Sequence, residues 1–302
     1  MYVPARLAVV LSLAVPVLAT AQATADAPSL ITAAALAAEL ASPHLVLLHV
    51  GDKEGYALGH IAGARLLELS MITAASPAPP LQNELPAPAE LEAKLEALGI
   101  GDGSRVVVYF AKAELPQMAR VVFTLDYAGL GGRTSILDGG LPAWVRAGQA
   151  VTDVVPAPAT PGTLTIDPKT SALVDLAWLR ANTENAAVHV LDARPVESYT
   201  GADDRGGAIK RPGHVPGAVN VPYSTFFRDD LTLKPVDELR QMLVNAGAKP
   251  GEPLISYCTS GVQASVPYVV ARLLGYDVKV FDGSYQQWSA SDAPVVTGGT
   301  PR

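Results

Sequence analysis

Three groups of residues occur twice in this chain of 302 residues, in the same order each time. A Gly-His pair followed by Gly-Ala comes first, a glycine closing an apolar stretch comes second, and an Asp-Gly pair followed by tryptophan comes third. Self-similarity of this kind is the signature of a repeated structural unit. The chain is therefore predicted to fold as two similar domains in tandem. The paired ranges are 59–64 with 213–218, 127–129 with 274–276, and 137–144 with 281–288.

The domain boundaries follow from these repeats and from a change of composition between them. We place the first domain at residues 29–150 and the second at 169–299. Residues 151–168 are rich in Pro, Ala and Thr and lack periodicity, which is typical of a linker running over the surface. Each domain then has a usual length of roughly 100–200 residues.

The N-terminus is predicted to be a secretory signal peptide at residues 1–21. Arg6 precedes an apolar stretch at 7–18, and the small residues Ala19, Thr20 and Ala21 follow it. No other stretch offers the roughly 20 continuous apolar residues that a transmembrane helix needs. We therefore expect an exported protein, periplasmic or secreted, with no membrane span in its mature form.

Composition and charge exclude some partners. Hydrophobic residues make up 49% of the chain and charged residues 17%, as expected of well-filled cores. The net charge of −7 and the lack of basic runs argue against binding of nucleic acid. An anionic substrate would need a local positive site, because the field of the whole protein repels it.

Short runs of β-branched residues alternate with stretches that carry apolar residues at helical spacing. This alternation predicts an α/β fold in which each domain has a mostly parallel sheet flanked by helices on both faces. Ligands of such sheets bind at the carboxyl ends of the strands. The expected strands are 44–50, 105–110, 134–137, 187–191, 254–257 and 277–281, and the clearest helices are 90–98, 235–246 and 263–274.

Cys258 is the only cysteine of the chain, and it stands where the expected strand 254–257 gives way to a loop at 259–264. A strand-to-helix turn gathers backbone N–H groups that stabilise a thiolate or a persulfide anion. Pro267 is tolerated only in the first turn of a helix, so the helix should begin at about 264–266. We expect the amides of 259–264 to form a cradle around the sulfur. The alternative is a buried, inert cysteine.

The chain resembles the tandem-domain rhodaneses, the thiosulfate and 3-mercaptopyruvate sulfurtransferases, over essentially all of its mature length. The resemblance rests on four motifs in family order. They are Leu-Asp-Ala-Arg-Pro at 191–195, Gly-His-Val-Pro-Gly-Ala at 213–218, Tyr-Cys-Thr-Ser-Gly-Val-Gln-Ala at 257–264, and Phe-Asp-Gly-Ser at 281–284 before Trp288.

The resemblance implies a persulfide relay with Cys258 as the nucleophile. A small anionic donor, thiosulfate or 3-mercaptopyruvate, would give its sulfane sulfur to Cys258, and a thiophilic acceptor such as cyanide or a thiol would remove it. No cofactor or metal is implied. Arg194 is expected to bind the donor, and Ser260 to contact it. The other substrate-binding candidates are the loop residues Thr259, Gly261, Val262, Gln263 and Ala264.

The first domain departs from the active pattern. Phe110 stands where the second domain has Cys258, and His49 stands where it has Asp192. Phenylalanine cannot carry sulfur. We therefore expect an inactive first domain that packs on the second and helps to wall the active-site cleft.

Several other polar and aromatic residues attract attention. The repeated His60 and His214 are interpreted as hydrogen-bonded turn residues, because no metal-ligand spacing accompanies them. For Arg211 a second contact to the donor and a surface ion pair remain equal alternatives, and the segment 203–211 is either an entrance loop or a solvated insertion. Two repeated pairs remain: Trp144 and Trp288 are expected in the cores, and Asp138 and Asp282 at turns or caps.

Two alternative functions stay open. A cysteine-dependent phosphatase would usually close its loop with an arginine, whereas this loop has Gln263 and Ala264. An exported, non-catalytic persulfide carrier would have the same cysteine but negligible turnover. The donor also stays open: the small and polar Thr259 and Ser260 favour the mercaptopyruvate type, but they do not exclude thiosulfate.

Overall fold

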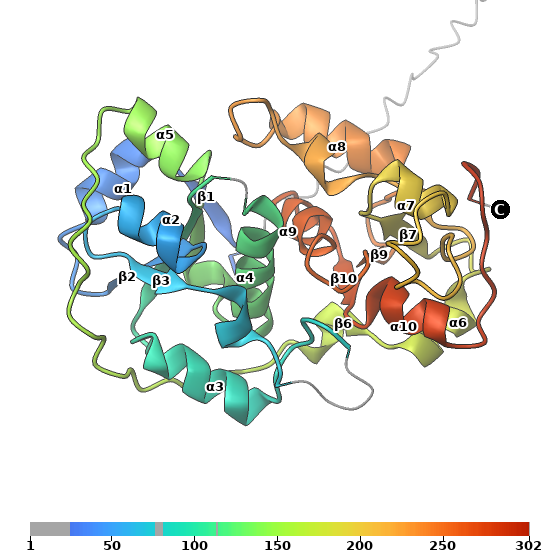
Figure 1. Ribbon diagram of the computed structural model, residues 1–302, viewed down its shortest axis with the longest axis horizontal. Coiled ribbons are helices and arrows are strands. Elements are labelled where there is room, and N and C mark those ends of the chain that lie inside the picture. Colours follow the sequence, from blue (N-terminus) through green and yellow to red (C-terminus); the bar gives the residue numbers. More distant parts are fainter. Residues whose placement is uncertain (1–24, 76–80, 113, 302) are drawn as a thin grey trace, which may run out of the picture.

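The computed structural model describes residues 25–75, 81–112 and 114–301. The predicted signal peptide lies outside the described residues. Two domains stand side by side, each built on a five-stranded sheet (Figure 1). The strand order is β1-β5-β4-β2-β3 in the first sheet and β6-β10-β9-β7-β8 in the second, and every strand pair is parallel. The predicted duplication and the α/β fold are confirmed.

The elements of the first domain alternate between strand and helix along the chain. The strands are β1 (Ser29–Ile31), β2 (Leu45–Val50), β3 (Arg65–Leu67), β4 (Arg105–Phe110) and β5 (Thr134–Leu137). The helices are α1 (Ala33–Glu39), α2 (Lys53–Leu58), α3 (Pro88–Ala97), α4 (Leu115–Tyr127) and α5 (Gly140–Arg146), with short 3-10 turns η1 (Leu69–Ile72) and η2 (Gly131–Arg133).

The second domain repeats this order. Its strands are β6 (Leu173–Val174), β7 (His189–Asp192), β8 (Val219–Asn220), β9 (Leu254–Tyr257) and β10 (Val278–Phe281). Its helices are α6 (Leu176–Asn182), α7 (Val196–Thr200), α8 (Val236–Asn245), α9 (Ser265–Leu273) and α10 (Ser284–Ala290), with 3-10 turns η3 (Thr170–Ala172) and η4 (Tyr223–Phe226).

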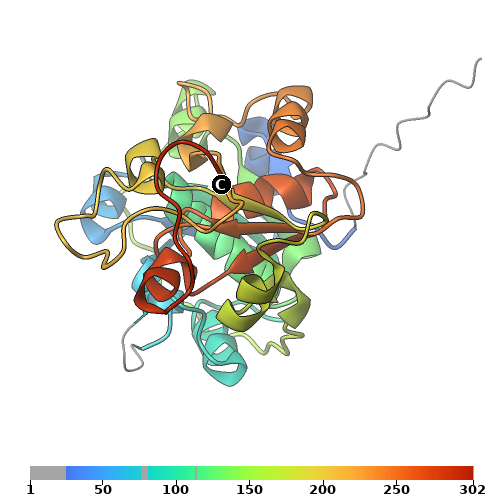
Figure 2. The ribbon, with the colours of Figure 1, turned by 90° about the vertical axis from the view of Figure 1, so that its right-hand side faces the viewer.

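Each sheet buries both of its faces, as purely parallel sheets do. In the second domain Leu179 of α6 and Trp288 of α10 pack on one face, and Leu239 of α8 and Val269 of α9 on the other. Figure 2, which faces this domain, shows helices on both sides of its strands. The first domain has the same division, with α1 and α5 on one face and α3 and α4 on the other.

The helices that follow the two central strands meet at the domain interface. Helix α4 packs against α9, and both lie at the centre of the molecule (Figure 1). Phe123 and Tyr268 make an edge-to-face contact there, with ring centroids 4.7 Å apart. One continuous cluster of buried apolar residues runs from the first core through these helices into the second. The two domains therefore share a core, and the loops before α4 and α9 lie close to the interface.

The linker runs along the outside of the first domain before it enters the second (Figure 1). Residues 153–169 contain no helix or strand. Backbone hydrogen bonds still hold them, because Thr152 pairs with His60 and the Gly162 amide donates to Glu96 O at 2.9 Å. None of the helices within the described ranges combines the length and the apolar character that a bilayer crossing requires.

Candidate active site

Cys258 directly follows β9 and lies at the base of a cavity of about 400 Å³. Its side chain is buried, with 1% of its surface exposed. The cysteine loop contributes Thr259, Ser260, Val262 and Gln263 to the cavity wall. The structure therefore brings four of the predicted loop residues together with the thiol. It does not place the predicted Gly261 and Ala264 in the wall. The remaining wall residues are Arg205 and Tyr223 from the second domain and Leu69, Asn83, Pro116 and Gln117 from the first.

The loop after Cys258 is held in place through its carbonyls. Cys258 O and Thr259 O accept the amides of Tyr285 and Gln286 at the start of α10, each at 2.9 Å. The amides of 259–264, in contrast, donate to no acceptor among the described residues. Backbone N–H groups in folded proteins almost always find a partner, so these amides suit water or a bound anion. The condition for the predicted cradle holds in the described part of the chain.

Two local features shape this loop. Helix α9 begins at Ser265, which places Pro267 in its first turn and confirms the predicted start. Gly261 adopts a left-handed conformation with φ +84°, which glycine reaches without strain. A Cβ at this position would meet Asp282 and Arg120 at 2.9 to 3.1 Å. The loop is therefore packed tightly against both domains.

The first domain reaches the loop through an interdomain clamp formed by Arg120 and Asp282. Arg120 of α4 is 1% exposed and donates from Nη1 to Asp282 Oδ1 at 2.6 Å. Its Nη2 donates to Asn83 O at 2.5 Å, and the Leu85 amide donates to Asp282 Oδ2 at 2.9 Å. Asn83 Nδ2 then donates to Ser260 Oγ at 3.1 Å. Residues of the first domain thus complete the active-site wall.

Asp138 and Asp282 lie in turns, as predicted, but the alternative role as helix caps is wrong. Neither α5 nor α10 receives a side-chain cap, because Gly139 and Gly283 occupy the cap positions. Each aspartate instead accepts a leucine amide from the other domain, Leu233 for Asp138 and Leu85 for Asp282, both at 2.9 Å. Sequence alone did not reveal this role, because it depends on how the domains pack.

The structure does not place Arg194 at the cavity, contrary to the prediction that it binds the donor. Its guanidinium is 1% exposed and forms a close ion pair with Asp192, with Nη2 2.5 Å from Oδ2. It also donates to Gly213 O at 2.7 Å and lies 4.0 Å from the centre of the Tyr285 ring. Burial would lower its pKa, but the charge of Asp192 holds the pKa above its ordinary value.

Arg194 and Asp192 support the strand that leads to the thiol. Asp192 Oδ2 accepts a hydrogen bond from the Tyr257 hydroxyl at 2.5 Å, and that hydroxyl accepts the Val215 amide at 3.1 Å. Burial and the nearby carboxylate raise the pKa of Tyr257 well above its ordinary value, so the hydroxyl keeps its proton. The residue before Cys258 is therefore fixed from two sides.

Arg205 is the arginine that lines the cavity. Its Nη1 donates to Thr259 Oγ1 at 3.4 Å, and the segment 203–211 that carries it is an insertion of the second domain only. Of the two alternatives for this segment, an entrance loop fits the structure, because Arg205 lines the cavity. The sequence did contain a signal for this contact: a cation in a segment that the first domain lacks, close to the Gly-His motif.

Arg211 is neither a contact to the cavity nor part of an ion pair with a described residue. Its guanidinium donates to the carbonyls of Trp288, Ser289, Ser291 and Ala293. It therefore closes the C-terminal end of α10, where cations also favour the helix dipole. Both alternatives for this residue are wrong.

Two glutamines supply unsatisfied acceptors to the cavity. The side-chain oxygens of Gln117 and Gln263 are buried and have no hydrogen-bond partner among the described residues. Both residues line the cavity beside Cys258. A buried acceptor without a partner is costly, so both suit a bound molecule that donates hydrogen bonds. Within the same described ranges, no group of three or more His, Cys, Asp or Glu side chains is arranged to hold a metal.

The repeated aromatic residues have the structural roles predicted for them. His60 stacks on Tyr56 and His214 on Tyr199, with ring centroids 3.8 Å apart in both pairs. Both ring nitrogens of each imidazole lie 2.9 to 3.2 Å from backbone carbonyl oxygens. Trp144 and Trp288 are buried and donate to the backbone that follows their helices.

Comparison with known proteins gives consistent results over both domains. The profile of the Rhodanese-like domain family matches residues 32–147 and 175–291. A thiosulfate sulfurtransferase of Pseudomonas aeruginosa is 32% identical over 89% of this chain and 97% of its own length. A 3-mercaptopyruvate sulfurtransferase of Escherichia coli is 31% identical over 85% of this chain and 90% of its own length.

Solved structures show the same two-domain arrangement. The crystal structure of SseA from Escherichia coli, a 3-mercaptopyruvate sulfotransferase, matches with a TM-score of 0.74 and 26% identity, and the match covers 85% of this chain and 98% of that one. The EanB complex with ergothioneine matches with a TM-score of 0.79 at 23% identity over 89% of this chain and 70% of that one, which shows a shared fold alone.

Proposed function

Because this chain belongs to the rhodanese family, with two rhodanese-like domains in tandem, we propose that it is a sulfurtransferase whose Cys258 carries the sulfur. The observation that supports this most strongly is the position of the thiol, at the base of a polar cavity and beside six amides that no described residue satisfies. Sulfurtransferases acting on two donors, thiosulfate and 3-mercaptopyruvate, are both similar to this chain.

The first half-reaction loads the cysteine. The Cys258 thiolate attacks the sulfane sulfur of the donor, and a new S–S bond forms. With thiosulfate, the S–S bond of the donor breaks and sulfite leaves with its electron pair. With 3-mercaptopyruvate, the C–S bond breaks and the enolate of pyruvate leaves and takes up a proton. The amides of 259–264 would stabilise the anion on the outer sulfur.

The second half-reaction unloads it. A nucleophile such as cyanide or a thiolate attacks the outer sulfur, and the S–S bond to Cys258 breaks with its electron pair returning to the cysteine thiolate. Cyanide leaves as thiocyanate and a thiolate as a persulfide, so no external oxidant or reductant takes part. No group on the enzyme has to accept a proton in this step.

Arg205 supplies the local positive charge that an anionic donor requires. It lines the cavity and bonds the hydroxyl of Thr259, whereas the guanidinium of Arg194 is committed to Asp192. The hydroxyl of Ser260 and the side-chain NH2 groups of Gln117 and Gln263 would donate hydrogen bonds to the anionic end of the donor. The first domain would be non-catalytic, because Phe110 replaces the nucleophile.

Loading and turnover can be measured separately. Incubation with thiosulfate alone should add one sulfur atom to the chain, as seen by intact mass, and cyanide should remove it as thiocyanate. Values of kcat/KM for thiosulfate and for 3-mercaptopyruvate should both be measured, since the ratio identifies the preferred donor. If the persulfide forms but none of the acceptors removes its sulfur, the result would contradict catalysis and indicate a carrier. Hydrolysis of p-nitrophenyl phosphate would indicate phosphatase chemistry instead.

Export is the second part of the proposal. It is supported by Arg6, the apolar stretch 7–18 and the small residues 19–21, which have the order of a secretory signal. Expression of the full chain should yield a shorter mature protein outside the cytoplasm. Replacing Leu11 and Leu13 by arginine should keep the chain inside and unprocessed, and export of this variant would contradict the proposal.

A further inference from the structure

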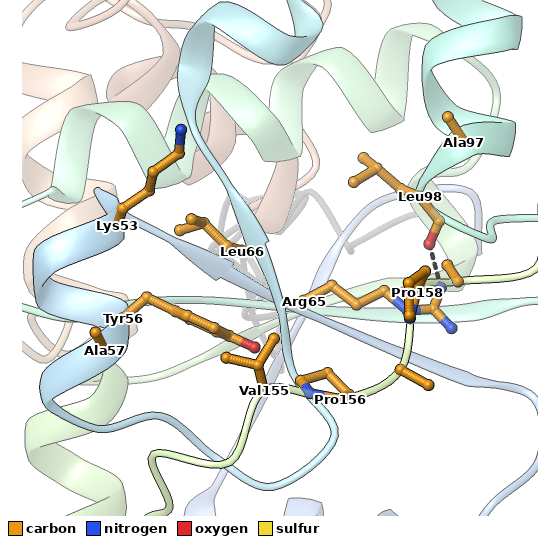
Figure 3. Close-up of a pocket in the computed structure, with 12 residues that line it drawn as sticks. Lys53, Tyr56, Ala57, Arg65, Leu66, Ala97, Leu98, Val155, Pro156 and Pro158 are labelled. Carbon is orange, nitrogen blue, oxygen red and sulfur yellow. Dashed lines mark hydrogen bonds between the residues drawn. The ribbon is translucent and has the colours of Figure 1, made fainter.

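A second cavity, of about 430 Å³, lies on the first domain and shares no wall residue with the cavity at Cys258. It is open to solvent and is lined by residues of α2 and β3, by the end of α3 and by linker residues 155–159 (Figure 3). Its volume falls within the roughly 300–1,000 Å³ usual for small-molecule sites. Nothing in the sulfur-transfer reaction uses it.

The walls of this cavity are mostly apolar and are held in place. Leu66 and Leu98 line one side, and Val155 and Pro158 of the linker line the other (Figure 3). The linker is anchored beside them, because His60 Nε2 lies 3.2 Å from Val154 O. Val154 and Val155 nevertheless leave 70% and 68% of their surfaces exposed. Apolar surface left open beside a formed cavity suits a ligand with an apolar body.

Arg65 brings an uncompensated positive charge to the same cavity. Its half-buried guanidinium donates from Nη1 to Leu98 O, but Nε and Nη2 meet no acceptor among the described residues. Within the same ranges no carboxylate pairs with it, and burial lowers its pKa. A desolvated cation without an anion is costly. The fold itself does not require it, because the matching position in the second domain is Val219.

We propose that this cavity binds an organic monocarboxylate with an apolar chain or ring, whose carboxylate pairs with Arg65. The fork of the guanidinium matches two carboxylate oxygens. The hydrocarbon would lie between Leu66 and the linker. A single negative charge fits best, because the second cation of the cavity, Lys53, is 83% exposed and already lies 4.0 Å from Glu68.

Calorimetric titration of the full chain with octanoate tests this proposal, with octanol and octyltrimethylammonium as uncharged and cationic controls. Octanoate should saturate one site and bind at least about tenfold more tightly than either control. Arg65→Gln should weaken octanoate binding by at least about tenfold. Arg133→Gln is the matched control, because Arg133 also donates to backbone carbonyls but lies outside the cavity, and it should bind octanoate normally.

Two further variants keep the result decisive. Val155→Asp changes an exposed linker residue and should also weaken octanoate binding by about tenfold, through repulsion and loss of apolar contact. Arg205→Gln should leave it unchanged. The proposal is overturned if octanoate binds no better than octanol. It is also overturned if Arg65→Gln and Val155→Asp bind octanoate like the native chain. Loss of octanoate binding in Arg205→Gln alone would overturn it too, because the anion would then bind at Cys258. Retained sulfur transfer in Arg65→Gln and Val155→Asp shows that these two variants fold.

Discussion

Tyr109 and Tyr257 occupy the same place in the two domains, at the end of a central strand, and each hydroxyl lies near 3 Å from a repeated backbone amide. The amides are those of Ile61 at 3.0 Å and Val215 at 3.1 Å. Each tyrosine also pairs with a residue of the neighbouring strand, His49 in the first domain and Asp192 in the second. The frame around the active position is therefore the same in both halves.

The two halves differ in what fills that frame. After Tyr257 comes a small thiol in a cavity of about 400 Å³, whereas after Tyr109 comes Phe110, beside a cavity of only about 20 Å³. The Phe110 ring packs against Gly140, and Leu231 and Leu233 of the second domain line the remaining space. The two halves therefore differ both in the residue after the tyrosine and in the space around it, although the supporting strands are nearly equal.

Replacing the nucleophile should produce the largest effect. Cys258→Ser should lower sulfur transfer by at least about 1,000-fold, because the hydroxyl cannot carry a sulfane sulfur. Thiocyanate formation measures this. Phe110→Cys in the same variant is the sharper test of the comparison, since the filled loop of the first domain should leave it inactive. Activity regained through residue 110 would show that the two loops are interchangeable.

Substitution of Asp138 and of Asp282 should affect activity differently, although each accepts a leucine amide from the other domain. Asp282→Ala frees Arg120 and the 83–85 segment from the cysteine loop, and should lower kcat/KM by about 10- to 100-fold through misplaced contacts. Asp138→Ala breaks the mirror-image bond to Leu233 and should cost about 1–3 kcal/mol of unfolding free energy while changing kcat/KM less than about twofold. Kinetics and urea unfolding of both variants decide this. Equal losses of activity would contradict it.

Arg205 has no equivalent in the first domain, and its removal should act on binding alone. Arg205→Gln should raise KM for an anionic donor by about tenfold and leave kcat unchanged, because one charge-assisted contact is lost. The effect should shrink as ionic strength rises. The neighbouring exposed Lys210→Gln provides the control. A fall in kcat with unchanged KM would assign Arg205 to the chemical step instead.

His49 stands where the second domain has Asp192, and its removal should have the smallest effect on turnover. Burial, followed by the charge of His60, lowers the pKa of His49 to about 4. The unfolded chain therefore binds this proton more tightly, at about pH 6.5, and stability falls as pH drops from 6.5 to 4. The loss is up to about 3 kcal/mol.

The His49→Gln variant should lack this part of the acid sensitivity and keep its activity at pH 7. Urea unfolding between pH 4 and pH 7 measures the difference. His44→Gln, which removes an exposed histidine of the same domain, should follow the native curve. Parallel curves for the native chain and His49→Gln would contradict a buried neutral imidazole.

Sequence reasoning located the central strands well, because they are longer than the edge strands and rich in apolar and β-branched residues. The strands 105–110, 134–137 and 254–257 agree with the structure to the residue. The edge strands β1, β3, β6 and β8 were missed, since two or three residues carry no recognisable alternation. Their position depends on pairing with a neighbour, which the local sequence does not record.

The site was predicted in part, for a similar reason. Cys258 and its loop form one continuous segment, so their proximity follows from the chain itself. Asn83 and Arg120 enter the site from the other domain, and no local pattern announces them. The family motif predicts Arg194 as a contact to the donor, but Asp192 occupies its guanidinium in the structure. The carboxylate of Asp192, two residues before Arg194, was the one signal in the sequence that the guanidinium could be engaged in an ion pair.

Asp282 of the second domain accepts hydrogen bonds from Leu85 and Arg120, and Arg120 also donates to Asn83 O, so the first domain is bound directly to the wall around Cys258. A duplicated domain that makes no contact with the active site can accumulate substitutions without loss of activity. This first domain, in contrast, forms part of the wall around Cys258. A random-mutagenesis screen for lost thiocyanate production should therefore collect hits around Asn83 and Arg120 as well as Cys258. Substitutions that abolish activity should then be found in both domains.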